Sequence, residues 1–498
     1  MRSILPNFHC FASHSSGQLE KSVLITKAEQ MPQNHTASVP LVEKVMQEIH
    51  KRISSRKALS GSKLPSVRDM ANKMQVSKST VVDAYDRLVA QGVIFSKPGS
   101  GFYASAQAHP FSVADAGPKL DHDIDPLWLT RHALEPQDAK FKPGCGWLPS
   151  HWMPEDEIKK SLRNLARANH ADLTEYAPPK GLPALRDYLV RRLSNSDIQA
   201  SAQQIIITES GTQALDLICR FLINPGDVVL VDDPCYFNFH SLLRVHRANI
   251  ISVPYTRTGP DLEQFEKILS THSPRLYITN SALHNPTGAT LAPHVAHRLL
   301  KIADQHNLLI VEDDIFADFE LEPATRLAAF DGLDRVLHIG SFSKTLTASI
   351  RCGYIAARSD WIEELVDLKL ATSFGGANLS AQLVHSVLMD GSYRKHMNRV
   401  RGKLADARTI VSANLKRIGL VPWIEPEAGM FLWCKLPNGL DAAKVADAGM
   451  KLGIVLAPGN AFSLSQSAPE FMRINVAQST HAHVFPLIEQ AMAISTIK

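Results

Sequence analysis

The stretch of residues 340–354, GSFSKTLTASIRCGY, places a lysine among groups that a surface lysine does not need. Lys344 stands close behind Ser341 and Ser343, and Arg351 follows shortly after it. A lysine that acts as a nucleophile must be held in place and kept partly unprotonated, which desolvation or a neighbouring cation achieves. The stretch therefore raises two alternatives, a reactive lysine and an ordinary surface base.

Other residues able to do chemistry follow short apolar runs. A cluster of carboxylates around Asp313 comes after LLIV, and carboxylates at the end of a buried strand need a cationic partner. A turn of small residues, with Gly211 and Thr212, leads from QIIIT into a helical pattern and could bind phosphate, although such a turn alone is weak evidence. Tyr236 follows DVVLV, and Asn285 follows LYIT within NSALHNPTG.

The runs themselves predict the elements that must position these residues. Each run is short, rich in β-branched residues and bounded by turns, and helical patterns separate the runs. They are QIIIT, DVVLVD, NIISVPY, RLYIT, LLIVED, VLHIGS and CGYIAA. This alternation predicts an α/β fold with a mostly parallel sheet and helices on both faces. Ligands of such sheets bind beyond the carboxyl ends of the strands, where the residues named above should lie.

From about residue 125 to the C-terminus, these motifs resemble fold type I pyridoxal-phosphate enzymes of the aspartate aminotransferase class, which implies a small domain beside the large sheet. The resemblance implies that Lys344 carries the cofactor covalently and that Asp313 pairs with its pyridinium nitrogen. It also implies that Tyr236 stacks on the cofactor ring and that Asn285 donates to the phenolic oxygen. Donors around the cofactor phosphate would come from Gly211, Thr212, Ser341, Ser343 and Arg351.

Two further residues match positions that face the substrate in this family. Arg473, in FMRINVA, corresponds to the arginine that binds the substrate carboxylate as a bidentate fork. Tyr176, in YAPPKGLPALR, corresponds to an active-site loop that the family often shares across a dimer. Each residue alone has a structural explanation, as an ion-pair partner or as core filling. Their appearance together and in family order favours the functional interpretation.

The sequence departs from the family pattern after Asp313. A tyrosine normally stands two or three residues after this aspartate and hydrogen-bonds the phenolic oxygen, but Ile315 and Phe316 occupy those positions here. Ala348 also replaces a proline, which is a milder change. We expect the missing phenol to weaken turnover without preventing attachment of the cofactor.

The N-terminal part of the chain has a different charge balance. Residues 42–103 contain eleven bases and five acids and therefore carry a net charge of +6. Because the whole chain carries +4, the remaining residues carry a net charge of −2. A basic segment on a near-neutral body is expected where only that segment meets a polyanion. A solvated basic face without a partner is the alternative.

Within this basic segment, LVEKVMQEIHKRI predicts one helix, with Leu41 at the start of its apolar stripe. Ser66 and Ser77 are predicted N-caps of two more helices; the apolar face of the last one includes Val89, and a wing hairpin follows. Residues 40–104 resemble the winged helix-turn-helix of the GntR superfamily. By position, Arg68 and Lys78 would reach DNA; the remaining residues implied to contact DNA are Ser66, Ser77, Thr80 and Gly101. Lys78 replaces the more usual arginine, so a base contact there is expected to become a phosphate contact.

The boundaries of the four parts of the chain and its expected compartment follow from composition. We predict a flexible tail over residues 1–39, the head over residues 40–104, a linker over residues 105–123 and the trunk over residues 124–498. No apolar run is long enough for a membrane span, and six scattered cysteines indicate neither disulfides nor a metal site, so a cytoplasmic protein is expected.

A GntR-type head joined to an aminotransferase-like trunk is the architecture of MocR-type bacterial regulators, some of which sense γ-aminobutyrate or pyridoxal phosphate. The resemblance implies a homodimer that reads two half-sites of duplex DNA and responds to an amino compound. An active aminotransferase with an appended DNA-binding head remains an alternative. A repressor whose trunk only dimerises, without cofactor, is a weaker third possibility.

Overall fold

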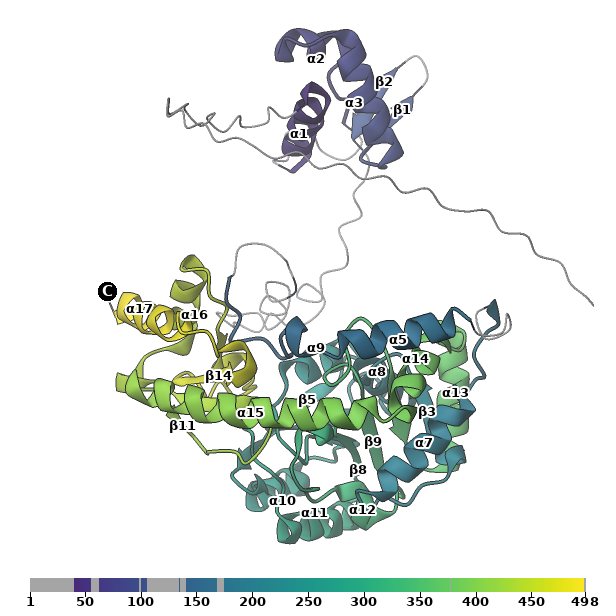
Figure 1. The fold of residues 1–498 in the computed structure, drawn as a ribbon, viewed down its shortest axis with the longest axis vertical. Coiled ribbons are helices and arrows are strands. Elements are labelled where there is room, and N and C mark those ends of the chain that lie inside the picture. The colour runs from purple at the N-terminus through teal and green to yellow at the C-terminus, as the bar shows by residue number, and fades with distance from the viewer. Residues whose placement is uncertain are drawn as a thin grey trace, which may run out of the picture. The chain divides into compact units, whose positions relative to one another are not determined.

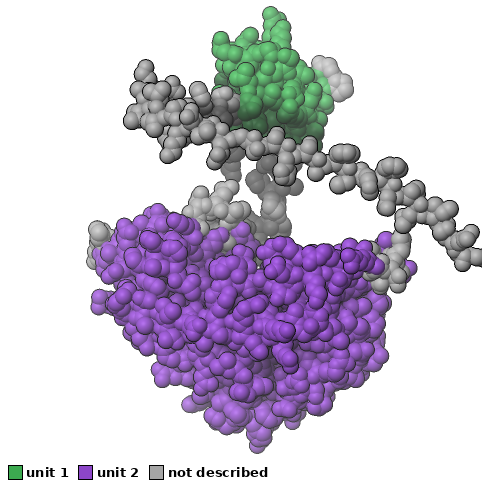
Figure 2. Space-filling model, viewed as in Figure 1, with its two compact units in different colours: residues 1–110 green, residues 111–498 purple. Residues whose placement is uncertain are grey.

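The computed structural model describes residues 40–54, 62–97, 100–104, 134, 140–167, 174–376 and 378–496. Its chain divides into two compact units, residues 1–110 and residues 111–498 (Figure 2). The predicted tail over residues 1–39, the predicted linker over residues 105–123 and the predicted start of the trunk at residue 124 lie outside the described residues.

The head contains three helices and a hairpin in the predicted order. The helices are α1 (Leu41–Ser54), α2 (Val67–Met74) and α3 (Lys78–Ala90), and the strands are β1 (Ile94–Lys97) and β2 (Gly101–Ala104). Ser66 caps α2 by accepting from the Asp69 backbone N–H, and Ser77 caps α3 by accepting from the Thr80 N–H. These caps satisfy backbone donors that a helix start leaves free, so both helices begin where the sequence predicts.

The head has its own small core. Val45, Ile49, Tyr85 and other buried apolar side chains of the three helices pack together, and the Tyr85 hydroxyl donates to the Pro65 carbonyl at 2.9 Å. Two residues of the predicted apolar stripes lie near helix ends and are exposed: Leu41 is 54% exposed and Val89 is 37% exposed.

All seven predicted strands are present in the trunk. They are β3 (Ile205–Thr208), β4 (Val228–Asp233), β5 (Asn249–Thr256), β7 (Leu276–Thr279), β8 (Leu309–Asp313), β9 (Val336–Ser341) and β10 (Gly353–Ala356). Together with the short β6 (Gly259–Pro260) they form one sheet in the order β3-β10-β9-β8-β7-β4-β5-β6. Neighbours from β5 through β9 pair in parallel, while β10 is antiparallel to both of its partners. The sheet is therefore mostly parallel, as predicted.

Side chains of these strands alternate between two separate cores. In β4, Val229 and Val231 belong to one cluster, whereas Leu230 between them belongs to the other. In β8, Ile310 and Val311 divide in the same way. Because successive side chains of a strand point to opposite faces, this division means that both faces are covered.

The helices that cover the large sheet come from most of the trunk sequence. They are α5 (Glu155–Leu165), α7 (Pro183–Ser194), α8 (Gly211–Leu222), α9 (Phe237–Val245), α10 (Leu262–Thr271), α11 (Pro293–Gln305), α12 (Leu327–Asp331), α13 (Ser359–Ser373) and α14 (Asn378–Met389). The 26-residue helix α15 (Ser392–Arg417) runs along the trunk toward a second, smaller layer (Figure 1).

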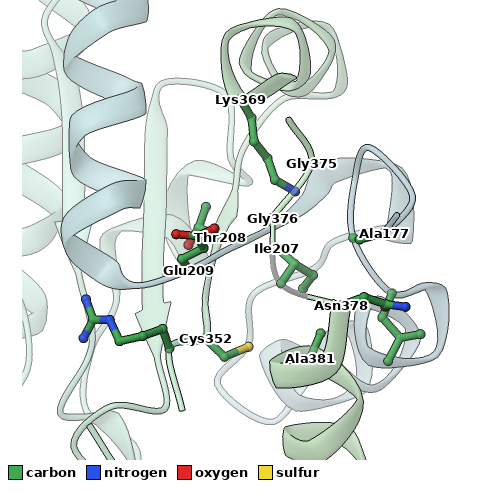
Figure 3. A pocket seen from close by; sticks show the side chains of 13 residues that line it. Ala177, Ile207, Thr208, Glu209, Cys352, Lys369, Gly375, Gly376, Asn378 and Ala381 are labelled. Atoms are coloured by element: carbon green, nitrogen blue, oxygen red, sulfur yellow. The ribbon is translucent and has the colours of Figure 1, made fainter. Parts of the chain in front are cut away.

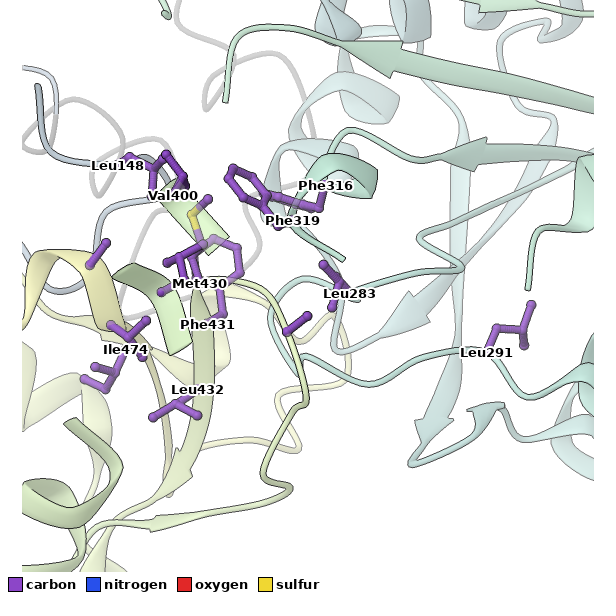
Figure 4. Close-up of a cluster of buried hydrophobic side chains, with 14 of the residues drawn as sticks. Leu148, Leu283, Leu291, Phe316, Phe319, Val400, Met430, Phe431, Leu432 and Ile474 are labelled. Atoms are coloured by element: carbon purple, nitrogen blue, oxygen red, sulfur yellow. The ribbon is translucent and has the colours of Figure 1, made fainter. Parts of the chain in front are cut away.

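That smaller layer is the small domain that the resemblance implies, although its strands were not predicted individually. Its antiparallel sheet has the order β11-β12-β14-β13. The strands are β11 (Val421–Pro422), β12 (Phe431–Lys435), β13 (Ala457–Pro458) and β14 (Phe471–Asn475), and helices α16 (Ala442–Lys451) and α17 (Val484–Thr496) lie beside them (Figure 1). Apolar side chains from both sheets' surroundings, including Leu283, Phe316 and Phe431, join in one buried cluster (Figure 4). The site described below lies beside this cluster.

Two further observations bear on the sequence-based predictions. None of the described helices combines the length and the apolar character that a membrane span requires. The five cysteines within the described ranges are free and buried, and Cys10 lies outside those ranges.

Candidate functional site

A cavity of about 50 Å³ lies beyond the carboxyl ends of the central strands. Eleven residues line it: Gly144, Cys145, Gly146, Trp147, Tyr236, Phe237, Asn285, Ile315, Phe316, Lys344 and Arg473. Tyr236 follows β4, Asn285 follows β7 and Lys344 follows β9, while Arg473 comes from β14 of the small sheet. The structure thus brings together four of the residues that the sequence singled out.

Lys344 is the only lysine in the lining of this cavity. Its Nζ donates a hydrogen bond of 2.8 Å to the Gly146 carbonyl. Burial, together with the nearby Arg473 cation, lowers the pKa of Lys344 to about 8, although Asp313 acts in the opposite direction. A larger fraction of this amine is therefore unprotonated near neutral pH than in a surface lysine.

Asp313 ends β8 and is 8% exposed. Burial raises its pKa to about 7, opposed by the Ile315 backbone N–H, which donates to Oδ1 at 3.2 Å. Asn280 donates to the Asp313 carbonyl oxygen and fixes the end of the strand. A buried carboxyl group with a raised pKa would be stabilised in its charged form by a cation placed next to it.

Arg473 is 2% exposed and makes two short hydrogen bonds through its terminal nitrogens. Nη1 donates to Asn285 Oδ1 at 2.9 Å, and Nη2 donates to the Gly144 carbonyl at 2.7 Å, whereas Nε has no partner. Its guanidinium also packs against the rings of Phe431 and Phe462, at 4.4 and 4.6 Å from their centroids. Burial lowers the pKa of Arg473 to about 10, so the group stays cationic at neutral pH and lacks an anionic partner among the described residues.

The walls of the cavity are largely aromatic and aliphatic. Tyr236 lies against Phe237 and Phe239, with ring centroids 5.0 and 5.5 Å apart, and burial raises the pKa of its hydroxyl. Phe316 is 3% exposed and meets the Phe431 ring edge to face at 5.5 Å. Ile315 and Phe316 both face the cavity, so neither of the two positions that could carry a phenol supplies a hydroxyl there.

The residues predicted to bind phosphate lie around the start of α8. A Cβ added at Gly211 would lie 3.7 Å from Ser341 Cβ, so the glycine leaves the space beside Ser341 open. Ser341 Oγ and Ser343 Oγ are 3.2 Å apart, and Ser210 caps the helix by accepting from Gln213. The two other predicted donors, Thr212 and Arg351, have exposed side chains.

Tyr176 does not line the cavity. Its side chain is 78% exposed and lies against Phe374, which is 66% exposed, with ring centroids 5.1 Å apart. Within this chain Tyr176 therefore makes no contribution to the site, and the predicted role across a dimer stays a prediction.

The segment from Gly144 to Trp147 was missed from the sequence, although it supplies four of the lining residues. Gly144 packs so tightly that a Cβ would lie 2.7 Å from the Ala457 nitrogen. The close pair of glycines in GCGW was the available signal, since glycine often marks a close backbone approach.

A second lysine with a lowered pKa, more deeply buried than Lys344, lies in a different pocket (Figure 3). Lys369 of α13 is 1% exposed and donates to the Pro179 carbonyl at 2.9 Å, and burial lowers its pKa to about 8. Its cavity is only about 10 Å³, so it has room for a water-sized group and no more. Lys369 has the pKa of a reactive lysine without the space to react.

In the head, the residues predicted to contact DNA lie on the surface around α2 and α3. Arg68 and Lys78 have exposed side chains at the first turns of these helices. The remaining ones are close to them or at the hairpin: Ser66, Ser77, Thr80 and Gly101. Ser66 and Ser77 are engaged as caps, and Gly101 has a φ of +105°, a conformation that side chains rarely adopt.

Comparison with known proteins identifies both parts of the chain. Residues 149–490 match the family "Aminotransferase class I and II", and residues 41–104 match "Bacterial regulatory proteins, gntR family".

Two relatives and one solved structure show how far the similarity extends. The chain is 29% identical over 446 residues to the uncharacterized HTH-type transcriptional regulator YdcR of Escherichia coli K12, covering 87% of this chain and 94% of that protein. It is 27% identical over 393 residues to the HTH-type transcriptional regulator NorG of Staphylococcus aureus, covering 76% of this chain and 87% of that protein. The Pyrococcus horikoshii kynurenine aminotransferase, solved with PMP, has a TM-score of 0.69 and 25% identity and covers 79% of this chain and 99% of that chain.

The family match over residues 149–490 spans well over half of the sequence, and the trunk has the sheet and helices expected of an aminotransferase. The alignment to YdcR covers 87% of this chain and 94% of that regulator, as expected if the two proteins share both parts. The chain therefore belongs to the aminotransferase class I and II family, and it carries a gntR-family helix-turn-helix domain ahead of the aminotransferase domain.

Proposed function

We propose that this protein regulates transcription by binding duplex DNA through its head and an amino compound through a pyridoxal phosphate site in its trunk. The observation that carries the proposal is the meeting of Lys344, Asn285 and Arg473 in one cavity of a chain that also has a gntR-family domain. Names of the relatives, HTH-type transcriptional regulators, support the same conclusion.

The residues of the cavity fit the chemistry of the proposed cofactor, together with Asp313, which is not one of the eleven lining residues and lies at the end of β8. Pyridoxal phosphate supplies an aldehyde that reacts with amines and a ring that withdraws electrons. Lys344, with its lowered pKa, would hold the cofactor covalently, and Asp313 would face the pyridinium nitrogen. Tyr236 would lie against the ring. Asn285 accepts from Arg473 through its oxygen, which leaves its Nδ2 free to donate to the phenolic oxygen.

The phosphate would lie at the start of α8. Gly211 leaves room there, the helix N-terminus presents backbone N–H groups, and Ser341 and Ser343 add hydroxyls. Thr212 and Arg351 would complete the set from the exposed side of the site. Arg473 would bind the carboxylate of the amino compound, which would supply the anionic partner that it lacks.

We also propose that the protein acts as a homodimer on two DNA half-sites and resides in the cytoplasm. The exposed pair of Tyr176 and Phe374 supports the dimer, because two large aromatic side chains are left for another surface to cover. Arg68 and Lys78 would contact DNA from each head, with phosphate contacts from the cap residues.

A working aminotransferase is the second candidate, favoured by the intact set of Lys344, Asp313 and Arg473. Phe316 in place of the family's tyrosine argues against efficient turnover. One experiment separates the candidates: the absorption of the cofactor-loaded protein is titrated with a panel of amino acids and γ-aminobutyrate while DNA binding is followed by anisotropy. A regulator changes its DNA affinity in parallel with the spectrum. An enzyme releases a keto acid from an α-amino acid, or an aldehyde from γ-aminobutyrate, without any change in DNA affinity. If the protein takes up no cofactor, both candidate functions are refuted, and the remaining alternative is a repressor whose trunk only dimerises.

A further inference from the structure

Strand β8 and the residue after it carry three carboxyl groups in a row, on Glu312, Asp313 and Asp314, and each residue is at most 8% exposed. The Asp314 N–H donates to the Ile339 carbonyl at 2.9 Å, so the pairing with β9 continues past the end of the strand. Successive side chains of an extended chain point to opposite faces of the sheet. Glu312 and Asp314 accordingly share His338 as a neighbour, at 3.5 and 3.8 Å, and Asp313 lies on the other face.

Arg326 binds Asp314 on that side of the sheet and is itself 1% exposed. Its Nε and Nη2 each donate at 3.1 Å, to the two separate oxygens of the Asp314 carboxylate. Nη2 also donates to Glu320 at 2.6 Å, and Nη1 donates to the Ala324 carbonyl at 2.7 Å. All three nitrogens are therefore engaged, and the paired contact with Asp314 uses the planar shape of the guanidinium, which an ammonium group lacks.

The two carboxylates that share Arg326 are bound unequally. Asp314 accepts two hydrogen bonds from it, whereas Glu320 accepts one through Oε2, and the buried Oε1 of Glu320 has no partner. Burial raises the pKa of Glu320 to about 7, so a proton can neutralise this carboxyl group near neutral pH. The contact that Arg326 holds most firmly is therefore the one with the chain neighbour of Asp313.

The two hydrogen bonds that hold Asp313 both involve the main chain. The Ile315 N–H donates to its Oδ1 at 3.2 Å, and Asn280 donates to its main-chain carbonyl at 2.8 Å. The first of these contacts spans Asp314, so the direction of the Asp313 carboxyl group depends on the conformation of the chain at Asp314. Arg326 fixes that conformation, because two hydrogen bonds to the Asp314 carboxylate leave it little freedom to turn.

We propose that Arg326 is a positioning residue: by binding Asp314 on one face of the sheet, it holds the Asp313 carboxylate on the other face toward the pyridinium nitrogen of the cofactor. This inference rests on the cofactor site of the proposed function and adds a residue outside it. Arg326 does not line the cavity of Lys344 but a separate one of about 250 Å³. A carboxylate stabilises the protonated ring nitrogen only from a fixed place, and a displacement of about 1 Å removes much of such an effect.

Nitrogen-15 NMR tests the position of Asp313 in the full-length protein loaded with pyridoxal phosphate that carries the isotope in its ring. The chemical shift of this nitrogen reports whether it is protonated. The unmodified protein should show the protonated nitrogen, and Asp313→Asn, which cannot pair with it as an anion, defines the signal of the unprotonated one. Arg326→Lys keeps the buried positive charge but removes the paired contact, so its signal should move most of the way from the first value to the second.

Glu320→Gln is the matched control, because it changes the other partner of Arg326 and leaves the paired contact intact, so its ring nitrogen should stay protonated. Asp314→Asn weakens the paired contact from the opposite side and should reproduce the shift of Arg326→Lys. A protonated nitrogen in either cofactor-loaded variant overturns the inference, as does a shift of equal size in Glu320→Gln. If neither variant both folds, as judged by circular dichroism, and binds the cofactor, the role of Arg326 is structural and the inference is overturned as well.

The unmodified protein separates failure of this inference from failure of the proposed function. If it takes up no pyridoxal phosphate, the proposed function fails and the inference fails with it. If it binds the cofactor with an unprotonated ring nitrogen, the cofactor site stands, and only the role of Asp313 and the positioning by Arg326 are refuted.

Discussion

The head and the trunk bring cations to their ligands in opposite ways. In the head, Arg68 and Lys78 are exposed at the starts of two short helices. In the trunk, Lys344 and Arg473 lie in a cavity where burial lowers both pKa values. A polyanion is met by cations that remain hydrated, whereas a small molecule is met by cations that are already partly desolvated.

The difference also concerns what each cation contacts before its ligand arrives. Lys344 and Arg473 already donate to backbone carbonyls, so a ligand has to replace existing hydrogen bonds. The neutral partners can be exchanged for a charged one, which favours ligands with a carboxylate and a reactive carbonyl. The trunk is therefore expected to select among small molecules by their chemical groups. The head is expected to select its binding partner mainly by where the negative charges lie.

The largest expected effect would distinguish the two trunk lysines whose pKa is lowered to about 8, Lys344 and Lys369. Lys344→Ala should abolish covalent attachment of pyridoxal phosphate completely, because it removes the only amine in the cavity lining. Borohydride reduction of the cofactor-loaded protein, followed by peptide mapping, should label Lys344 and not Lys369, whose pKa is also about 8 but whose pocket is too small. The variant Lys369→Met should still be labelled at Lys344. A label on Lys369 in the unmodified protein would reverse the assignment.

The pH dependence of attachment should sharpen the contrast with an exposed lysine. Since only the unprotonated amine reacts and the pKa of Lys344 is lowered to about 8, the rate of cofactor attachment should rise about tenfold per pH unit below pH 8 and level off above it. Stopped-flow absorption on the cofactor-free protein measures this rate. Arg473→Gln should move the midpoint to higher pH, because it removes a neighbouring positive charge. A midpoint near 10.5, the ordinary value for lysine, would mean that Lys344 is not desolvated.

The affinity of the cavity for a carboxylate should depend on both the charge and the planar shape of the Arg473 guanidinium. Arg473→Ala should weaken binding of amino acids by about ten- to a hundredfold, since hydrogen bonds between charged groups contribute about 1.5–3 kcal/mol. Arg473→Lys should restore only part of the affinity, because an ammonium cannot make the bidentate contact. Calorimetric titration of the cofactor-loaded variants measures both, and an amine without a carboxylate is the control ligand, whose affinity should not change.

In the head, substitutions should separate charge from sequence reading. Arg68→Ala should cost about 1–3 kcal/mol and relax the sequence preference if this residue reads a base, whereas Lys78→Ala should weaken all sequences alike and reduce the salt slope by about one. Arg87→Ala is the matched control on α3, because Arg87 is already paired with Asp83 at 2.9 Å. Anisotropy titrations at several salt concentrations measure these changes. An Arg87→Ala effect as large as that of Arg68→Ala would contradict the predicted contact surface.

The smallest expected effect concerns the missing phenol. Phe316→Tyr should raise the rate of any transamination half-reaction by up to about tenfold, because one added neutral hydrogen bond contributes about 0.5–1.5 kcal/mol. Single-turnover absorption measurements with an amino acid measure the rate. An unchanged rate would show that the hydroxyl does not reach the phenolic oxygen, and Ile315→Tyr would then test the neighbouring position in the cavity lining.

The parts of the fold that were predicted from the sequence depend on local signals. The strands of the large sheet are apolar runs bounded by turns, and the structure places them within a residue or two of the predicted ends. The caps at Ser66 and Ser77 were predicted for the same reason, since the capping side chain and its partner are three residues apart. Residues at strand ends could likewise be expected to share one edge.

The parts that were missed depend on contacts between distant residues. Gly146 and Lys344 are 198 residues apart, and Gly144 and Arg473 are 329 apart, so no local pattern indicates that they meet. The strands of the small domain were not predicted individually, and two of them have only two residues, too few to form an apolar run. Arg326, which forms buried ion pairs with both Asp314 and Glu320, was also missed, although a cationic partner for the carboxylates after β8 was expected.

The packing of Arg473 against Phe431 and Phe462 bears on the stereochemistry of the ligand. Two aromatic rings within 4.6 Å of the guanidinium leave it little freedom to turn, so a carboxylate has to approach in one plane. In the proposed function, Lys344 would fix the place of the cofactor carbon that takes the amine, and Arg473 would fix the place of the carboxylate. The two mirror images of an amino acid then direct their side chains to opposite walls of the cavity, which makes the site chiral by construction.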